Sequence, residues 1–245
     1  MASTSASGNL LKGKACLVCR LQEELLTLTS EYLTVGLNNP TPTAFMHALQ
    51  MEVLLASYFF SNNRTLEGTY RANAVAAMAL ACRLHVIGSV CGPTSNVWPI
   101  SILYRLAAPT NVVEMGERIN AFWTIYALDK AWSFALGYAS AFMDDKRKGT
   151  EIDVPWPLTV YDNMLVSLHT VKVFVSGASP AHAQESLLAL CVKAILLMEH
   201  ATRIVNLFPG GYVPADASQL DQHIKQFKRV LEQGCDGVGH VCPRA

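Results

Sequence analysis

The spacing of apolar residues constrains this 245-residue chain most, because it is helical along most of the sequence. Leu21, Leu25, Leu28, Tyr32 and Val35 recur at steps of four and three, which places them on one face of a short helix. No segment sustains the alternation of apolar and polar residues that a half-buried strand needs. No period of about 34 or 40 residues marks a repeat solenoid. The sequence therefore predicts an all-α fold, an irregular multi-helix array.

Clusters of Pro, Gly, Asn and Ser divide the chain into segments. After a short helix and linker over 21–42, we expect helices over 43–60, 66–84, 113–136, 181–207 and 218–231. The stretch 88–111 is predicted to be mostly loop, 144–149 to be a charged, exposed loop, and Pro155 and Pro157 to hold extended chain. Ala72, Ala76 and Ala79 should let a neighbouring helix approach closely.

Composition limits the classes of function. Hydrophobic residues make up 51% of the chain, which is enough to fill a sizeable core. Basic and acidic residues number 19 each, so there is no net positive charge to attract a phosphate backbone. The bulk of the chain is therefore expected to bind nucleic acid poorly.

Targeting signals and cysteine usage favour an intracellular protein. Residues 1–9 are small and polar, without the apolar core of a secretory signal. The apolar windows 72–91 and 187–198 are interrupted by charged residues, so we interpret them as buried helices and expect no membrane association. The seven cysteines are scattered and odd in number, which predicts free thiols.

Residues 117–157 carry the most specific pattern of the chain. An Arg precedes a Trp-rich helix, a Leu-Asp pair and a Leu-Gly turn follow, and the segment closes with Asp-Val-Pro-Trp-Pro. The pattern is carried by Arg118, Trp123, Leu128, Asp129, Leu136, Gly137, Asp153, Val154, Pro155 and Trp156. It resembles the signature of the fungal-specific transcription factor domain, the middle homology region of zinc binuclear cluster regulators.

The resemblance covers roughly 43–233 and implies a regulatory domain that is truncated at its C-terminus, with 234–245 as an unrelated tail. It implies a nuclear regulator of transcription by RNA polymerase II. Arg118, Trp123, Asp129 and Trp156 are then scaffold residues. Arg118 and Asp129 lie three helical turns apart on one side, where each can tie a neighbouring element to the helix rather than act as an acid-base couple.

Cys16 and Cys19, in the stretch Lys-Ala-Cys-Leu-Val-Cys-Arg, resemble the opening of the zinc binuclear cluster. The third cysteine of that cluster would fall at position 26, which is Leu26, and the basic run before it is replaced by Leu-Gln-Glu-Glu. A structural zinc site needs four ligands. Residues 1–20 are therefore interpreted as a disordered remnant that does not bind zinc stably. Full-length relatives bind promoter DNA through zinc, whereas this chain is expected not to bind DNA specifically.

Catalysis is not expected. The sequence contains no phosphate-binding glycine loop, no metalloprotease helix motif and no nucleophile elbow, and its seven histidines are widely spaced. A pocket lined by Trp98, Trp123, Trp132 and Met78 could hold a small effector. Such residues in a helical domain are more often core.

Three functions remain open from the sequence. The first is the transcription regulator implied by the resemblance, acting through protein partners or a small effector. The second is a stand-alone helical interaction module, or a truncated, dominant-negative competitor of a full-length paralogue. The third is a small-molecule-binding bundle unrelated to transcription. The sequence does not determine dimerisation, target genes or the origin of the missing cysteines. Incomplete cover of the apolar face over 187–198 predicts poor solubility.

Overall fold

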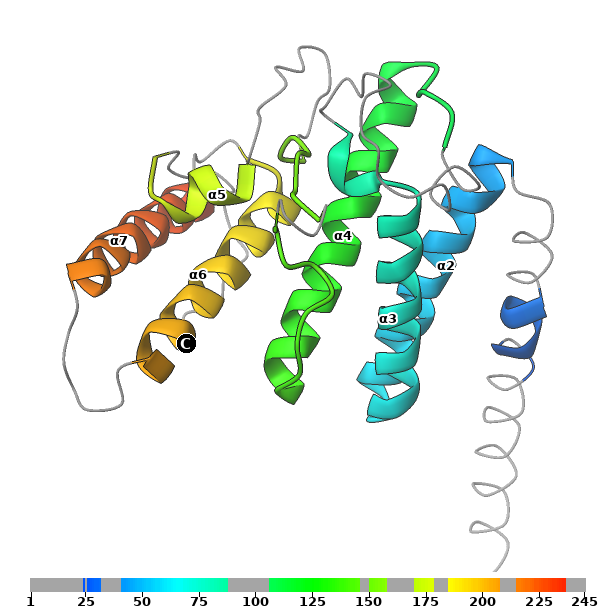
Figure 1. The fold of residues 1–245 in the computed structure, drawn as a ribbon, viewed down its shortest axis with the longest axis horizontal. Helices are drawn as coiled ribbons and strands as arrows, with labels where there is room; N and C mark the ends of the chain where they lie inside the picture. The colour runs from blue at the N-terminus through cyan, green and yellow to red at the C-terminus, as the bar shows by residue number, and fades with distance from the viewer. Residues whose placement is uncertain are drawn as a thin grey trace, which may run out of the picture.

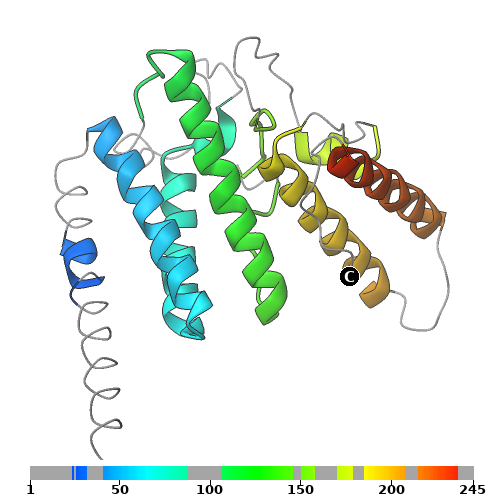
Figure 2. The ribbon, with the colours of Figure 1, turned by 180° about the vertical axis from the view of Figure 1, so that it is seen from behind.

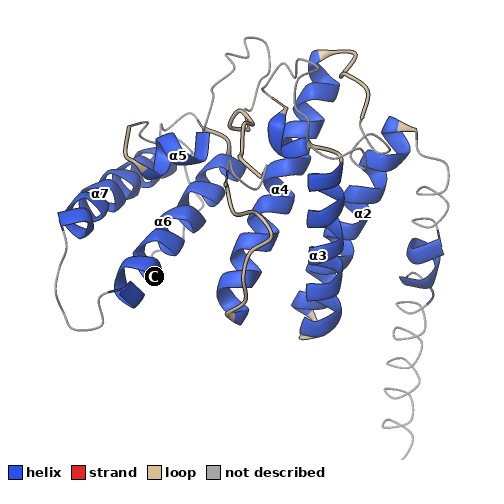
Figure 3. Cartoon of the chain, in the orientation of Figure 1, coloured by secondary structure: helices blue, strands red, loops and turns tan. Residues whose placement is uncertain are grey.

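The computed structural model describes residues 24, 26–31, 41–87, 106–145, 150–157, 170–178, 185–207 and 215–236. These ranges contain helices and no strand, so the predicted all-α class is confirmed (Figure 3). In chain order the elements are α2 (Pro42–Ser61), α3 (Thr65–Ala81), the 3-10 turn η1 (Leu84–Val86), α4 (Val112–Leu136), α5 (Thr170–Val175), α6 (Leu187–Leu207) and α7 (Ala215–Asp236). A further helical turn lies over 26–31.

The long helices form an irregular, fan-shaped row (Figures 1 and 2). Helix α4 lies in the middle of the row and contacts α2 and α3 on one side and α6 on the other. Helix α7 and the short α5 contact α6 at the far end of the row. The helix that carries the signature is therefore the one that joins the two halves of the described fold.

The local sequence defines both ends of α4. At its N-terminus the Asn111 side chain accepts a hydrogen bond from the backbone N–H of Glu114 at 2.8 Å, as an N-cap residue does. At its C-terminus Gly137 adopts a left-handed conformation with φ of 74°, and its N–H donates to the Ser133 carbonyl. The helix predicted over 113–136 is confirmed, and the Leu-Gly turn of the signature is its C-terminal cap.

The core extends from α2 through α4 to α6. Helix α4 contributes large side chains that are almost inaccessible to solvent: Ile119, Phe122, Trp123, Ile125 and Tyr126. Helix α3 contributes small ones, and Ala72, Ala76 and Ala79 are each at most 1% exposed. The small residues of α3 thus lie between helices, as their spacing predicts.

Several predicted boundaries are wrong. The helix predicted over 66–84 ends at Ala81, because Arg83 turns the chain in a left-handed conformation with φ of 59°. Helix α7 is longer than the predicted 218–231 and extends into the first residues of the tail predicted over 234–245. Asp144, predicted in an exposed loop, is partly buried and accepts a hydrogen bond from the Ile152 N–H at 2.9 Å.

Helix α5 was not predicted, because β-branched residues dominate its sequence, Thr-Val-Lys-Val-Phe-Val, and such residues disfavour helix. Its buried residues Thr170, Val171 and Phe174 indicate that tertiary packing holds this single helical segment in place. In the helical turn over 26–31, Leu28 belongs to the predicted apolar face but is 61% exposed. Leu26, which lies outside that predicted face, packs against α2.

Other predictions are only partly covered by the structure. The helix over 181–207 is confirmed from Leu187 onwards. The proposed remnant over 1–20 and most of the loop over 88–111 lie outside the described residues. No helix in the described part of the chain combines the length and the apolar character needed to cross a bilayer.

Helices α2 and α3 meet closely at Gly68. A Cβ atom placed on Gly68 would lie 2.6 Å from a carbon of the Phe60 ring. That ring cannot withdraw easily, because it stacks on Trp132 with ring centroids 3.9 Å apart. The close approach of the two helices therefore requires a residue without a side chain at position 68.

We expect Gly68→Ala to lower the free energy of unfolding by about 1–3 kcal/mol through overpacking, even though alanine raises helix propensity by about 1 kcal/mol. Urea denaturation followed by circular dichroism measures the difference. In a Phe60→Leu background the same substitution should cost much less, because the obstructing ring is gone. An equal cost in both backgrounds would contradict the steric explanation.

Candidate functional site

Two tryptophans of the signature hold the extended segment 152–157 against α4. Trp123 is fully buried, and its indole N–H donates a hydrogen bond to the Pro155 carbonyl at 2.6 Å. Its ring stacks on Trp156, with centroids 4.5 Å apart and planes 20° from parallel. Trp156 in turn meets the Phe174 ring of α5 edge to face at 5.9 Å. We call the contact of Trp123 with Pro155 and Trp156 the tryptophan clamp.

The clamped segment also joins the elements on either side of α4. The Asp153 N–H donates to the His85 carbonyl of η1 at 2.7 Å. The Thr170 hydroxyl at the start of α5 donates to the Val154 carbonyl at 2.9 Å. The segment 152–157 therefore connects η1 to α5, and the Asp-Val-Pro part of the signature has a structural role.

The same segment reaches α6. The Ser186 hydroxyl donates to the Pro157 carbonyl at 2.6 Å, one residue before α6 begins. The Lys193 ammonium lies 4.7 Å from the centroid of the Trp156 ring and pairs with Glu185 at 2.5 Å. Burial lowers the pKa of Lys193, and the Glu185 carboxylate opposes this shift. A buried cation of α6 thus packs directly on the tryptophan clamp.

Arg118 and Asp129 are buried, and each ties a different segment to α4. Arg118 donates to the Ala107 carbonyl at 2.6 Å and pairs with Glu114. Asp129 accepts hydrogen bonds from the Ser140 hydroxyl at 2.5 Å and the Ala141 N–H at 3.1 Å. The prediction that these two charged residues fix neighbouring elements agrees with these contacts.

The described residues of the pocket predicted around tryptophans pack against other side chains. Trp123 belongs to the clamp, and Trp132 stacks on Phe60 on the opposite side of the fold. Met78 packs against the core, and Trp98 lies outside the described residues. Aromatic composition alone could not separate these packed side chains from a cavity lining.

Cys16 and Cys19 lie outside the described residues. Two thiolates supply half of the four ligands of a structural zinc site. The part of the chain that the structure describes contains no cluster of three metal-ligating side chains that could complete it. The expectation that Cys16 and Cys19 do not bind zinc stably therefore stays a prediction.

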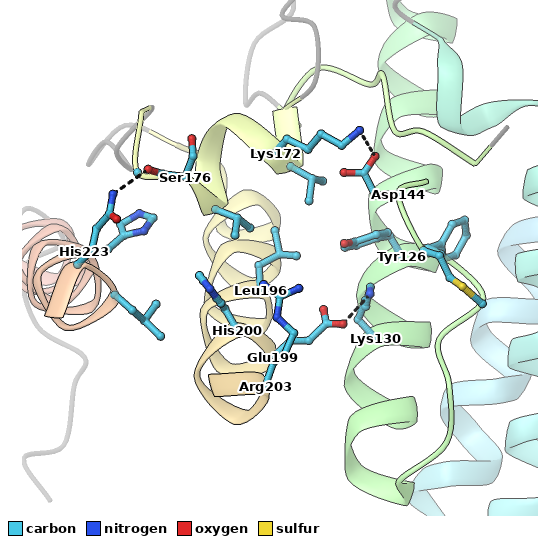
Figure 4. Close-up of a pocket in the computed structure, with 17 residues that line it drawn as sticks. Tyr126, Lys130, Asp144, Lys172, Ser176, Leu196, Glu199, His200, Arg203 and His223 are labelled. Atoms are coloured by element: carbon cyan, nitrogen blue, oxygen red, sulfur yellow. Dashed lines mark hydrogen bonds and ion pairs between the residues drawn. The ribbon is translucent and has the colours of Figure 1, made fainter. Parts of the chain in front are cut away.

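A cavity of about 550 Å³ lies between α4, α5, α6 and α7 (Figure 4). The apolar residues of its lining include Phe142, Val171, Val175, Leu196 and Leu220. Cavities of a few hundred Å³ that combine apolar walls with a few polar groups are typical of small-molecule sites. This cavity is therefore the candidate functional site.

Two ion pairs neutralise most of the charge around the cavity. Lys130 of α4 pairs with Glu199 of α6 at 2.9 Å (Figure 4). Lys172 of α5 lies 3.7 Å from the Asp144 carboxylate and 2.9 Å from a second carboxylate outside the lining. The lining also contains Arg203, and no carboxylate of the described residues lies within 4.0 Å of its guanidinium. Among the lining residues, three cationic side chains therefore face two carboxylates.

His223 of α7 lines the cavity (Figure 4). It is 7% exposed, its ring lies 4.7 Å from the Phe174 ring, and its Nε2 has no hydrogen-bond partner among the described residues. Burial lowers the pKa of His223, and the charges of Lys193 and His200 lower it further. The imidazole is therefore largely neutral at neutral pH.

The cavity residues were not identified from the sequence, although part of the signal was present. Leu196, Glu199, His200 and Arg203 are spaced as i, i+3, i+4 and i+7, so they share one face of α6. A mixed face of this kind is equally typical of a solvated helix. Only the positions of α5 and α7 show that this face lines a cavity.

Comparison of the chain with protein-family models, with curated proteins and with solved structures gives no match.

We expect Trp123→Phe to lower the free energy of unfolding by about 1–3 kcal/mol, because it leaves the buried Pro155 carbonyl without its donor. Chemical denaturation followed by far-ultraviolet circular dichroism checks this value. Trp132→Phe is the matched control, since its ring can still stack on Phe60. Equal losses in the two variants would show that the hydrogen bond of the clamp is unimportant.

The lowered pKa of His223 makes stability depend on pH. At pH values between that lowered pKa and the ordinary value of 6.5, the unfolded chain binds more protons at His223 than the folded chain does. The contribution of His223 to stability is therefore complete above pH 6.5 and falls as the pH decreases below it. Thermal unfolding between pH 5 and 8 should therefore show a weaker pH dependence in His223→Phe than in the unchanged chain. The exposed His47→Phe variant should retain the full dependence, and a retained dependence in His223→Phe would refute the assignment.

Proposed function

We propose that this chain is the regulatory domain of a transcription regulator of the fungal zinc-cluster type, acting in the nucleus on transcription by RNA polymerase II. The observation that carries the proposal is the tryptophan clamp. The parts of the signature that are distant in sequence, Trp123 on α4 and Pro155 with Trp156, contact one another in the structure. This contact supports the interpretation that the signature residues form one structural unit and are not a chance series.

Specific DNA recognition is not part of the function proposed for the isolated chain. Cys16 and Cys19 are too few to form the zinc cluster, and the chain has no net charge. Zinc and promoter DNA belong to the full-length relatives that the resemblance implies. This chain would act through a protein partner or a small effector in the cavity.

A second candidate is a stand-alone helical protein-interaction module without DNA binding. Leu66 and Tyr70 favour it, because they lie one turn apart on α3 and are 81% and 70% exposed. Large apolar side chains in such a position can anchor a partner protein. This candidate also covers a truncated form that competes with a full-length paralogue.

Two assays test the proposed function. Fused to a heterologous DNA-binding module in fungal cells, the chain should change expression of a reporter that carries the matching sites. In a gel-shift assay with a pool of random duplexes and zinc, the unfused chain should give at most weak binding that is lost at moderate salt.

Matched variants sharpen the reporter assay. Leu66→Ser with Tyr70→Ser removes the exposed pair of α3, so it should abolish the effect only if that surface binds the partner. A fusion with no effect on the reporter, despite normal expression, would contradict the transcriptional role. Sequence-selective, salt-resistant binding by the unfused chain would contradict the proposal that this chain does not recognise DNA specifically.

A further inference from the structure

We propose that the cavity between α4, α5, α6 and α7 binds an amphipathic carboxylate, with its carboxylate at Arg203 and its apolar body between α5, α6 and α7. The binding site depends on the cavity alone. Only its interpretation as an effector site rests on the proposed function. The proposal is drawn from three properties of the lining: its shape, its charge and its histidine.

The shape of the cavity accommodates an apolar body. Val171 and Val175 of α5, Leu196 of α6 and Leu220 of α7 all line the cavity. These side chains come from three helices, so an alkyl or aryl group between them would lose contact with water on several sides. Apolar contact is therefore available from each of these three helices.

The charge of the cavity selects an anion rather than a cation. Each of its two carboxylates, Asp144 and Glu199, lies within 4.0 Å of a lysine. Arg203 has no such carboxylate among the described residues, and it lies on the same face of α6 as Glu199. A cation would have to displace a lysine from its ion pair, whereas a carboxylate can take the vacant position opposite the guanidinium.

Guanidinium groups favour carboxylates, because their parallel N–H donors match the two carboxylate oxygens. Arg203 is near the last turn of α6 and is exposed, so it lies at the edge of the cavity. A carboxylate there keeps part of its hydration while its apolar body is buried. This arrangement avoids the cost of burying a charge completely.

His223 gives the cavity a neutral polar group at the wall opposite α4. Its imidazole is more than nine-tenths buried, and Nε2 lacks a hydrogen-bond partner in the described part of the chain. A neutral imidazole can donate or accept one hydrogen bond at that atom. A ligand with a hydroxyl or carbonyl group on its apolar body can therefore be held more tightly than a plain alkyl chain.

Isothermal titration calorimetry of the purified full chain tests the proposal. The probes are alkyl carboxylates from butanoate to decanoate, with 1-octanol and octyltrimethylammonium as neutral and cationic counterparts of octanoate. We expect saturable binding of one carboxylate per chain, an affinity that rises with chain length, and binding of octanoate at least about tenfold tighter than that of 1-octanol.

Two variants locate the site. Arg203→Gln should weaken octanoate binding about tenfold and leave 1-octanol unchanged, whereas Arg229→Gln, on the exposed face of α7 outside the cavity, should change neither. Val175→Trp should fill the cavity and abolish binding, provided that circular dichroism shows it to be folded. If Val175→Trp is unfolded, the Arg203 and Arg229 pair alone decides the result.

The absence of binding by every carboxylate would overturn the proposal. So would equal affinity for 1-octanol, or octanoate binding that Arg203→Gln leaves unchanged. The calorimetry needs no promoter, reporter or partner. Its result and the reporter result can therefore fail independently of one another.

Discussion

The tryptophan clamp is the interaction on which the rest of the fold depends. Its hydrogen bond from Trp123 to Pro155 and its indole stack fix an extended segment that has no helix of its own. Because that segment binds η1, α5 and the residue before α6, its position determines how the two halves of the fold meet. A buried carbonyl without a hydrogen-bond donor would cost about 1–3 kcal/mol. The indole N–H avoids this cost by donating to the Pro155 carbonyl.

The tryptophan clamp supports the candidate site but is not part of it. Trp123 and Trp156 do not line the cavity, but they support the elements that do, because Trp156 contacts Phe174 of α5 and Lys193 of α6. The signature residues and the ligand-sized cavity are therefore neighbouring but distinct features. Changes in the clamp should disturb the cavity through the positions of α5 and α6.

The two halves of the fold differ in what they offer a partner. Helices α2 and α3 pack through small residues, a ring stack joins α2 to α4, and α3 exposes Leu66 and Tyr70 to solvent. Helices α4 to α7 line a cavity with apolar walls, and Arg203 lies at its edge without a carboxylate partner among the described residues. A macromolecular partner suits the first surface, and a small anion suits the second. A regulatory domain that joins these two functions would use α4 as the connection between them.

The sequence by itself determined the helical class, the long helices and the ends of α4, because helical periodicity, Asn111 and Gly137 are local signals. It also indicated that Arg118 and Asp129 fix neighbouring elements, since charged groups in an apolar helix need partners, whereas Trp123 was assigned to the scaffold through the resemblance. Tertiary structure alone decided that β-branched residues 170–175 form α5 and that the cavity lies beside Arg203 and His223 rather than beside the tryptophans. Those outcomes depend on which helices become neighbours, and residue spacing within one helix does not specify which element packs against it.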